Sequence, residues 1–361
     1  MQFQVTHETR YDYLPPVEVA QHMSHLQPAS TATQALLSHS LHVMPVPARQ
    51  IRATDVYGNT RCFFSLQTAH SHLHVVAHSR VTTRARPLPA SAVAWEQVRE
   101  RFRFAAGSAY DAAAEFVFAS PYVPRHADFA AYARPSFTAG MPLLQGAQDL
   151  MRRIHTEFAY ESESTEVSTP ALEALAQRSG VCQDFAHIMI ACLRALGLSA
   201  RYVSGYLLTE PPPGVARLVG SDASHAWVSV YIPDFPTGDG WCDFDPTNDK
   251  VGWGAPGEDY ITLAIGRDYG DVSPLRGVIH GGAKHTLHVG VTVAPVEAAF
   301  ADCALVLPPG ALWQSQTQRP EPSQDQFQNQ GQGGDGPDGG GQSQSQSQSQ
   351  SQNQSQSQNQ R

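Results

Sequence analysis

A glycine-bearing turn that runs straight into an apolar helical pattern, at residues 178–187 (RSGVCQDFAH), limits the folds open to this chain more than any other segment. After Cys182 the apolar residues recur at steps of three and four, which is the helical period. They are Phe185, Ile188, Met189, Cys192, Leu193 and Leu196. Gly197 then ends the pattern, as glycine often does just past a helix. The pattern predicts a helix with Cys182 in its first turn.

The position of Cys182 suits a nucleophile. In the first turn of a helix the backbone N–H groups have no intrahelical partner and the dipole is positive, so a thiolate is stabilised there. The alternative is a small buried side chain, which is the commoner role of an isolated cysteine. Cys192 lies on the apolar stripe of the same helix and fits that alternative better. The spacing of ten between the two excludes a two-cysteine metal or redox motif on one turn.

Composition excludes several classes of protein. The chain has 361 residues, of which 41% are apolar and 16% charged, with a net charge of -9. We therefore expect a sizeable core in two or three units and no nucleic-acid surface, because no block of Lys and Arg is present. We expect neither a secretory signal nor a membrane span, since no apolar run is long enough. Five scattered cysteines are most simply reduced thiols in a cytoplasmic protein. They are Cys62, Cys182, Cys192, Cys242 and Cys303.

Periodicity and turn residues divide the chain into four segments. Residues 1–86 contain short alternating runs, with Pro15-Pro16 as a turn, and predict a small β-sandwich. Residues 87–142 predict a linker with short helices, and residues 143–310 predict a mixed core of helices and antiparallel strands with further strands at its end. Residues 314–361 are dominated by Gln, Ser, Gly and Asn, so we expect a disordered tail.

Three alternate histidines in the first segment, His70, His72 and His74, could line one face of a strand. No second cluster of ligands accompanies them, and exposed strand faces alternate in the same way. We expect no metal and no cofactor.

A cysteine nucleophile needs a base, and the base needs a third group to orient it. His225 lies at the start of an apolar strand pattern, and Asp245 lies where the next strand meets a proline. The twenty residues between them are about one antiparallel hairpin, so the two side chains can lie on neighbouring strands. Asp243 is an alternative to Asp245, because strand alternation puts both on one face.

Four motifs resemble the core of the bacterial transglutaminase-like superfamily. They are GVCQDFA at 180–186, ARYVSGY at 200–206, SHAW at 224–227 and FDPTN at 244–248. Residues 1–85 are similar to the β-rich N-terminal domain that accompanies this core in bacteria, so the resemblance extends over roughly residues 1–295. It implies an α+β fold, with a papain-like core that places the nucleophile at a helix N-terminus against an antiparallel sheet.

The resemblance also implies chemistry. Cys182, His225 and Asp245 match the catalytic triad, which favours Asp245 over Asp243. The family works through a thioester, so we expect a peptide or protein substrate whose amide or isopeptide bond is hydrolysed, with amine transfer that cross-links glutamine as the alternative. A non-catalytic interaction protein on the same fold is a further alternative. The oxyanion donors we expect are the backbone N–H of Cys182 and a side chain from Tyr160 or Gln177. No loop has calcium-ligand spacing, so we do not expect calcium dependence.

Overall fold

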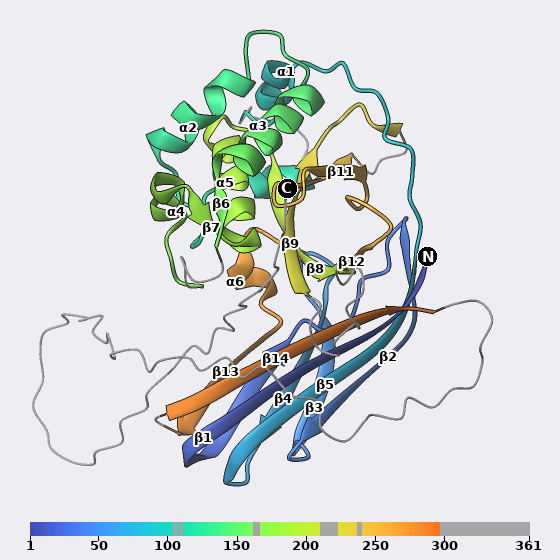
Figure 1. Ribbon diagram of the computed structural model, residues 1–361, viewed down its shortest axis with the longest axis vertical. Coiled ribbons are helices and arrows are strands. Elements are labelled where there is room, and N and C mark those ends of the chain that lie inside the picture. The colour runs from blue at the N-terminus through green and yellow to red at the C-terminus, as the bar shows by residue number, and fades with distance from the viewer. Residues whose placement is uncertain are drawn as a thin grey trace, which may run out of the picture.

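The structure is a computed structural model that describes residues 1–103, 107, 111–161, 167–209, 223–236, 240–282 and 284–296. A curved β-sheet lies at one end, and a helical layer around a second sheet lies at the other (Figure 1). The predicted mixture of helices and strands is confirmed. The predicted tail at 314–361 and Cys303 lie outside the described residues.

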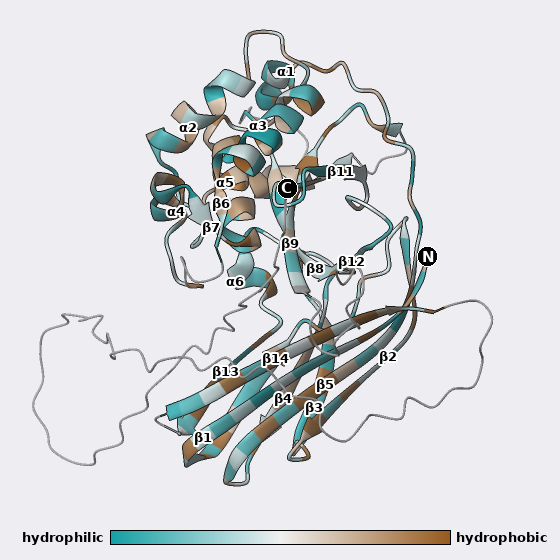
Figure 2. Cartoon of the chain, viewed as in Figure 1, coloured by the Kyte–Doolittle hydropathy of each residue, from teal (hydrophilic) through white to brown (hydrophobic). Residues whose placement is uncertain are grey.

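The curved sheet has seven strands built around one long strand. They are β1 (Gln2–Ser24), β2 (Gln34–Met44), β3 (Arg49–Thr54), β4 (Thr60–Leu66), β5 (His70–Thr83), β13 (Leu275–Gly281) and β14 (Lys284–Pro295). Hydrophobic and hydrophilic residues alternate in bands along them (Figure 2), as expected of strands with one covered face. The strands form a single sheet curved into a half-barrel, where the sequence predicted a small sandwich.

β1 runs through Pro15-Pro16, where the sequence predicts a turn. Along one edge of β1, β5 pairs with its first half and β4 with its second half; along the other edge, β14 and β13 do the same. The two prolines lie where the neighbours change on both edges, with no pairing partner on β5 or β13. Their missing N–H groups therefore cost few ladder hydrogen bonds, and the strand bends there instead of ending.

The strands at 275–295 belong to this same sheet. The sequence predicts them as part of the core at 143–310, whereas both pair with β1. Sequence patterns give the strands but not their partners, because pairing across more than 250 residues leaves no local signal.

The second sheet has five antiparallel strands in the order β11-β10-β9-β8-β12. They are β8 (Ala200–Leu207), β9 (Ala223–Tyr231), β10 (Trp241–Asp245), β11 (Lys250–Trp253) and β12 (Tyr260–Gly266). The helices around it are α1 (Trp95–Arg101), α2 (Ala127–Ala133), α3 (Leu143–Glu157), α4 (Ala171–Gln177), α5 (Cys182–Ala195) and α6 (Tyr269–Val272), with two short 3-10 turns at Ala112–Val117 and Arg134–Ser136. None of the helices in the described ranges has the length and apolarity needed to cross a bilayer.

α5 is the central helix. It packs on β8 and β9 and is surrounded by α2, α3 and α4, and nearly all its residues are buried. Its end follows the sequence pattern: Leu198 N–H donates to Leu193 C=O and Gly197 N–H to Arg194 C=O, with Gly197 at φ 80°. This is a Schellman cap, which needs the left-handed backbone that glycine adopts without strain.

The two sheets are joined along β12. The side-chain amide of Gln34 donates to Thr262 C=O and accepts from Thr262 N–H, both at 2.8 Å. Asn59 makes the same pair of bonds with Ile265, at 2.7 and 2.8 Å. Each amide replaces a missing strand partner, so the edge of the five-stranded sheet is covered by the curved seven-stranded sheet. This curved sheet is called the N-terminal sheet below, although it includes β13 and β14. One hydrophobic core contains residues of both sheets. The N-terminal sheet contributes Phe3, Val5, Val291 and Val293, among others, and the five-stranded sheet contributes Tyr202 and Val228, among others.

Candidate active site

Cys182 is the first residue of α5, as predicted, and is 3% exposed. The turn before it is held by Asp184, whose Oδ2 accepts from Val181 N–H at 2.9 Å. A Cβ at Gly180 would lie 2.7 Å from that oxygen, so only glycine allows the turn to approach the helix this closely. The start of the helix is therefore fixed, and with it the position of the thiol.

His225 lies on β9 and is 3% exposed. Its partner in the register with β8 is Gly205, where a Cβ would come within 2.4 Å of the Trp227 ring. The imidazole packs near Trp227 and Tyr260, with ring centroids 6.3 and 5.9 Å away. These neighbours hold the imidazole in one orientation.

The structure brings His225 and Asp245 together. His225 Nε2 donates to Asp245 Oδ2 at 2.7 Å, and Asp245 is fully buried at the end of β10. The same Oδ2 accepts from the Tyr260 hydroxyl at 2.6 Å and from the Asn248 amide at 2.7 Å, while Oδ1 accepts from Thr247 N–H at 2.9 Å. A buried carboxylate with four donors stays ionised and keeps its orientation.

Asp243 has a different partner. Its Oδ1 accepts from Trp227 Nε1 at 3.2 Å. The two carboxylates on β10 thus each bond a ring on β9, Asp243 to Trp227 and Asp245 to His225, with the same diagonal offset. Strand alternation alone could not distinguish them, but the register does.

The remaining nitrogen of His225, Nδ1, is buried and has no partner at ordinary hydrogen-bond geometry in the described part of the chain. Cys182 is nevertheless close enough to affect the charge state of the ring. Burial alone would disfavour the imidazolium, but the charge and hydrogen bond of Asp245, and then those of Cys182, raise the pKa of His225 to about 10. A loose thiol–imidazole contact is common in a site without substrate.

The negative charge of Asp245 complements the positive charge of the His225 ring. Burial opposes its ionisation, but the charge of His225 and the hydrogen bonds from His225, Tyr260 and Asn248 lower the pKa of Asp245 to about 2. At neutral pH the pair is therefore an imidazolium hydrogen-bonded to a carboxylate.

The two predicted oxyanion side chains differ in position. Tyr160 pairs in register with Gly180, next to the turn before Cys182. Burial, and then the charges of Cys182, Asp184 and Asp245, raise the pKa of Tyr160, so its hydroxyl remains a donor. Gln177 is exposed, and its amide donates to Glu173 Oε1 on the same helix at 2.9 Å. Only Tyr160 lies close to the cysteine.

Two groups that support Asp245 were not assigned from the sequence. Asn248 belongs to the FDPTN motif, three residues after Asp245, so a turn amide folding back on the carboxylate could have been inferred. Tyr260 begins β12, on the far side of β8 and β9 from β10, and no local pattern indicates its contact with Asp245. α3 contributes too, because His155 Nδ1–H donates to Thr247 C=O at 3.0 Å and fixes the turn.

No group of three or more His, Cys, Asp and Glu side chains in the described ranges is arranged to hold a metal ion. Two of the three alternate histidines on β5 are paired with carboxylates instead: His72 lies 2.6 Å from Asp12, and His74 lies 2.7 Å from Glu8.

Comparison with known proteins finds two matching family models and several similar sequences. A family model described as the transglutaminase-like superfamily matches residues 130–246, and one described as the bacterial transglutaminase-like N-terminal region matches residues 3–82. An uncharacterized protein of Mycobacterium tuberculosis is 41% identical over 303 residues, which cover 82% of this chain and 93% of the relative. A protein-glutamine gamma-glutamyltransferase of Pseudomonas aeruginosa is 36% identical over 101 residues, covering 27% of this chain and 14% of that protein.

One solved structure has a similar fold. The crystal structure of a candidate cysteine protease from Cytophaga hutchinsonii superposes with a TM-score of 0.61 at 22% identity and covers 82% of this chain and 92% of its own. At 22% sequence identity, the similarity between the two structures shows a shared fold.

Proposed function

The chain belongs to the transglutaminase-like superfamily, and from this premise we propose that it is a cysteine acyl-enzyme that cleaves peptide or isopeptide amide bonds through Cys182, His225 and Asp245. The observation that carries the proposal is the orientation of His225. Its Nε2 is held by Asp245 at 2.7 Å, while its Nδ1 has no such partner and Cys182 lies near the ring. A ring held from one side, with its second nitrogen facing a thiol, is suited to proton transfer.

In the first half-reaction the Cys182 thiolate attacks the amide carbonyl carbon and forms a C–S bond. The negative charge that develops on the carbonyl oxygen is stabilised by the backbone N–H of Cys182, and the Tyr160 hydroxyl is our choice of second donor. The His225 imidazolium then gives its proton to the leaving nitrogen as the C–N bond breaks. A thioester and a free amine result.

In the second half-reaction neutral His225 removes a proton from the acceptor, which attacks the thioester carbonyl. Water as acceptor releases a carboxylic acid and regenerates the thiol, and we favour this outcome. A primary amine as acceptor would instead form a new amide. The local similarity to a protein-glutamine gamma-glutamyltransferase favours this second candidate.

The test uses an activated acyl donor, because the natural substrate need not be known. With p-nitrophenyl acetate, wild-type protein should release nitrophenol in a burst of about one equivalent. Intact-mass measurement should then find one acetyl group per chain, and peptide mass spectrometry should place it on Cys182. Cys182→Ala should lose both the burst and the adduct, and His225→Ala should lose on the order of 10²–10⁴-fold in rate. A full burst from Cys182→Ala would refute the assignment of the nucleophile.

Addition of a primary amine to the acetylated protein separates hydrolysis from transfer. If acetate is the product with and without amine, the protein is a hydrolase; if the acetylated amine accumulates, it is a transferase. An intact fold with no burst and no selective reactivity of Cys182 would instead support a non-catalytic interaction protein.

A further inference from the structure

A polar cavity of about 180 Å³ lies where the N-terminal sheet meets the segment around α6. The residues that matter in its lining are His25, Asp55, Arg61, Arg267, Asp271 and Arg276. His25 follows β1, Asp55 is in the turn between β3 and β4, Arg61 is on β4 and Arg276 is on β13. Cys182, His225 and Asp245 do not line it, so it is separate from the candidate active site.

Both carboxylates of the cavity are already engaged. Asp55 accepts from the backbone N–H groups of Tyr57 and Asn59 and from the Asn59 amide, at 2.8 to 2.9 Å. Asp271 accepts from Nε and Nη2 of Arg267 at 2.9 and 3.0 Å, and from Arg267 N–H at 2.9 Å. One arginine is therefore neutralised within the wall.

The other two arginines retain donors. The Arg61 side chain makes no hydrogen bond with any residue that the structure describes, and its Nε is buried. Its guanidinium lies over the Phe63 ring, 5.1 Å from the centroid, a contact that uses none of its N–H donors. Arg276 uses Nη1 to bond Gly270 C=O at 2.6 Å, while Nη2 has only a 4.0 Å contact with the sulfur of Met23. Two guanidinium groups with unused N–H donors facing one cavity are an arrangement suited to an oxyanion.

His25 adds an acceptor. The side chain is 2% exposed, and its Nδ1–H donates to Ser273 C=O at 3.2 Å, which leaves the lone pair of the neutral ring on Nε2. Nε2 is buried, makes no hydrogen bond within the described ranges, and lies 3.7 Å from Asp55 Oδ2. Burial lowers the pKa of His25. The hydrogen bond to Ser273 C=O and the charge of Asp55 act to raise this pKa, while the charges of Arg276 and Arg61 act to lower it. The net effect is a lowered pKa, so the ring is neutral at pH 7.

We propose that this cavity binds an oxyanion that also carries a hydroxyl, with hydrogen phosphate as the representative ligand. Its anionic oxygens would accept from Arg61 and Arg276, and its P–OH would donate to Nε2 of His25. This pairing satisfies the buried donor on Arg61 and the buried acceptor on His25 together, and it places a negative charge between two guanidinium groups, which water cannot do. A bound anion would link the end of β1 to β4 and β13.

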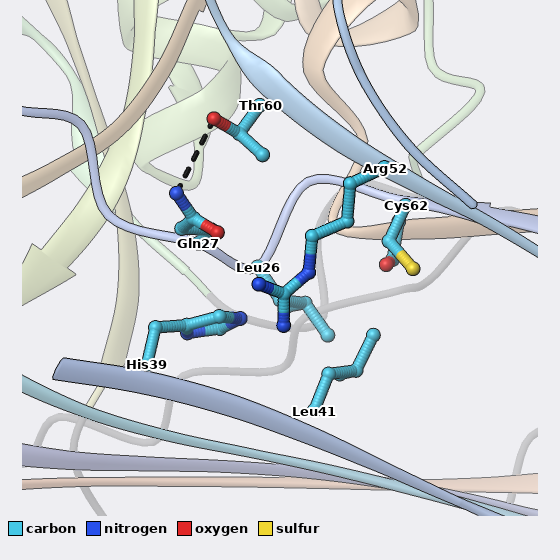
Figure 3. Close-up of a pocket in the computed structure, with 8 residues that line it drawn as sticks. Leu26, Gln27, His39, Leu41, Arg52, Thr60 and Cys62 are labelled. Atoms are coloured by element: carbon cyan, nitrogen blue, oxygen red, sulfur yellow. Dashed lines mark hydrogen bonds between the residues drawn. The ribbon is translucent and has the colours of Figure 1, made fainter. Parts of the chain in front are cut away.

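A second cavity, inside the N-terminal sheet, gives a contrast (Figure 3). Its volume is about 10 Å³, which holds one water at most. Gln27 in its wall already donates to Thr60 Oγ1 at 3.3 Å, and His39 is bonded to Ser79. Arg52 also lines it, but the space is too small for an oxyanion, so volume is what distinguishes it from the cavity near α6.

The test is calorimetric titration of the full chain with inorganic phosphate and with sulfate at pH 7. Arg61→Gln and Arg276→Gln should each weaken phosphate binding about tenfold or more, because each removes charge-assisted hydrogen bonds. Arg80→Gln is the matched control, since Arg80 is an exposed arginine of β5 whose side chain has no partner among the described residues. Sulfate has no hydroxyl at this pH and should bind more weakly than phosphate.

Equal phosphate affinity in wild type and in both glutamine variants would overturn the proposal, as would no phosphate binding to wild type at millimolar concentrations. Sulfate binding as tight as phosphate binding would overturn the role given to His25. If Arg61→Gln fails to fold by circular dichroism, Arg61→Lys decides instead. It keeps the charge but loses the planar fork, and should still bind phosphate more weakly than wild type.

Discussion

The Tyr260 hydroxyl and the His225 ring donate to the same oxygen of Asp245, at 2.6 and 2.7 Å. Tyr260 belongs to β12, the strand whose edge is covered by Gln34 and Asn59 of the N-terminal sheet. The carboxylate that orients His225 is therefore supported by a strand that the N-terminal sheet holds in place. The N-terminal sheet thus has a structural connection to the candidate active site.

Removal of the Tyr260 hydroxyl should destabilise the fold. Tyr260→Phe takes one donor from a buried carboxylate, and a hydrogen bond to a charged group is worth about 1.5–3 kcal/mol. Tyr206→Phe is the control, because the Tyr206 hydroxyl bonds neutral His7 at 3.0 Å and should cost only about 1 kcal/mol. Urea denaturation of both variants measures the difference, and equal losses would contradict the special role of Tyr260.

The two carboxylates of β10 should differ in their effect on catalysis. Asp245→Asn should reduce the nitrophenol burst rate by about 10²-fold or more with the fold intact, because the ring loses the charge that stabilises its imidazolium. Asp243→Asn keeps an oxygen for Trp227 Nε1 and should stay within about tenfold of wild type. A larger loss from Asp243→Asn than from Asp245→Asn would reverse the assignment.

Iodoacetamide at pH 7 should modify Cys182 before the other described cysteines. Burial raises the pKa of Cys192 and Cys242, and both are 0% exposed. Cys62, which is 6% exposed, is the internal comparison. Peptide mass spectrometry gives the rate at each site, and His225→Ala should slow the modification of Cys182 only. Modification of Cys182 no faster than of Cys62 would remove the main support for a nucleophile.

The hydrogen-bonded pair of His225 and Asp245 should also give the free energy of unfolding a characteristic pH dependence. The folded pKa of His225, about 10, is above its ordinary 6.5, so its contribution is full below about pH 6.5 and is lost as the pH rises to about 10. The folded pKa of Asp245, about 2, is below 3.8, so its contribution is full above about pH 3.8 and is lost as the pH falls towards 2. Between pH 6.5 and 10 the denaturation midpoint of wild type should therefore fall more steeply than that of His225→Gln. Parallel curves would mean that His225 titrates in the ordinary range.

Local patterns predicted the elements that carry the candidate site. The helix that begins at Cys182 and ends before Gly197 follows from apolar spacing and a glycine stop, and the strands of His225 and Asp245 follow from alternation and a proline. Which carboxylate faces His225 depends on the register of β10 against β9, which a pattern of period two cannot give. The contact of Tyr260 with Asp245 depends on sheet order, and the pairing of β13 and β14 with β1 on contacts between distant residues, so neither has a signature in the sequence.

The position of β1 between early and late strands has a consequence for synthesis on the ribosome. One edge of β1 can pair as soon as β4 and β5 have emerged. The other waits for β13 and β14, the first of which begins about 250 residues after β1 ends. Until then the nascent chain exposes an open strand edge rich in β-branched and aromatic residues, which is a site for wrong pairing between chains. Residues 3–82 should therefore not be expected to fold as an isolated fragment, although a family model delimits them, and expression of the region should include the segment that closes the sheet.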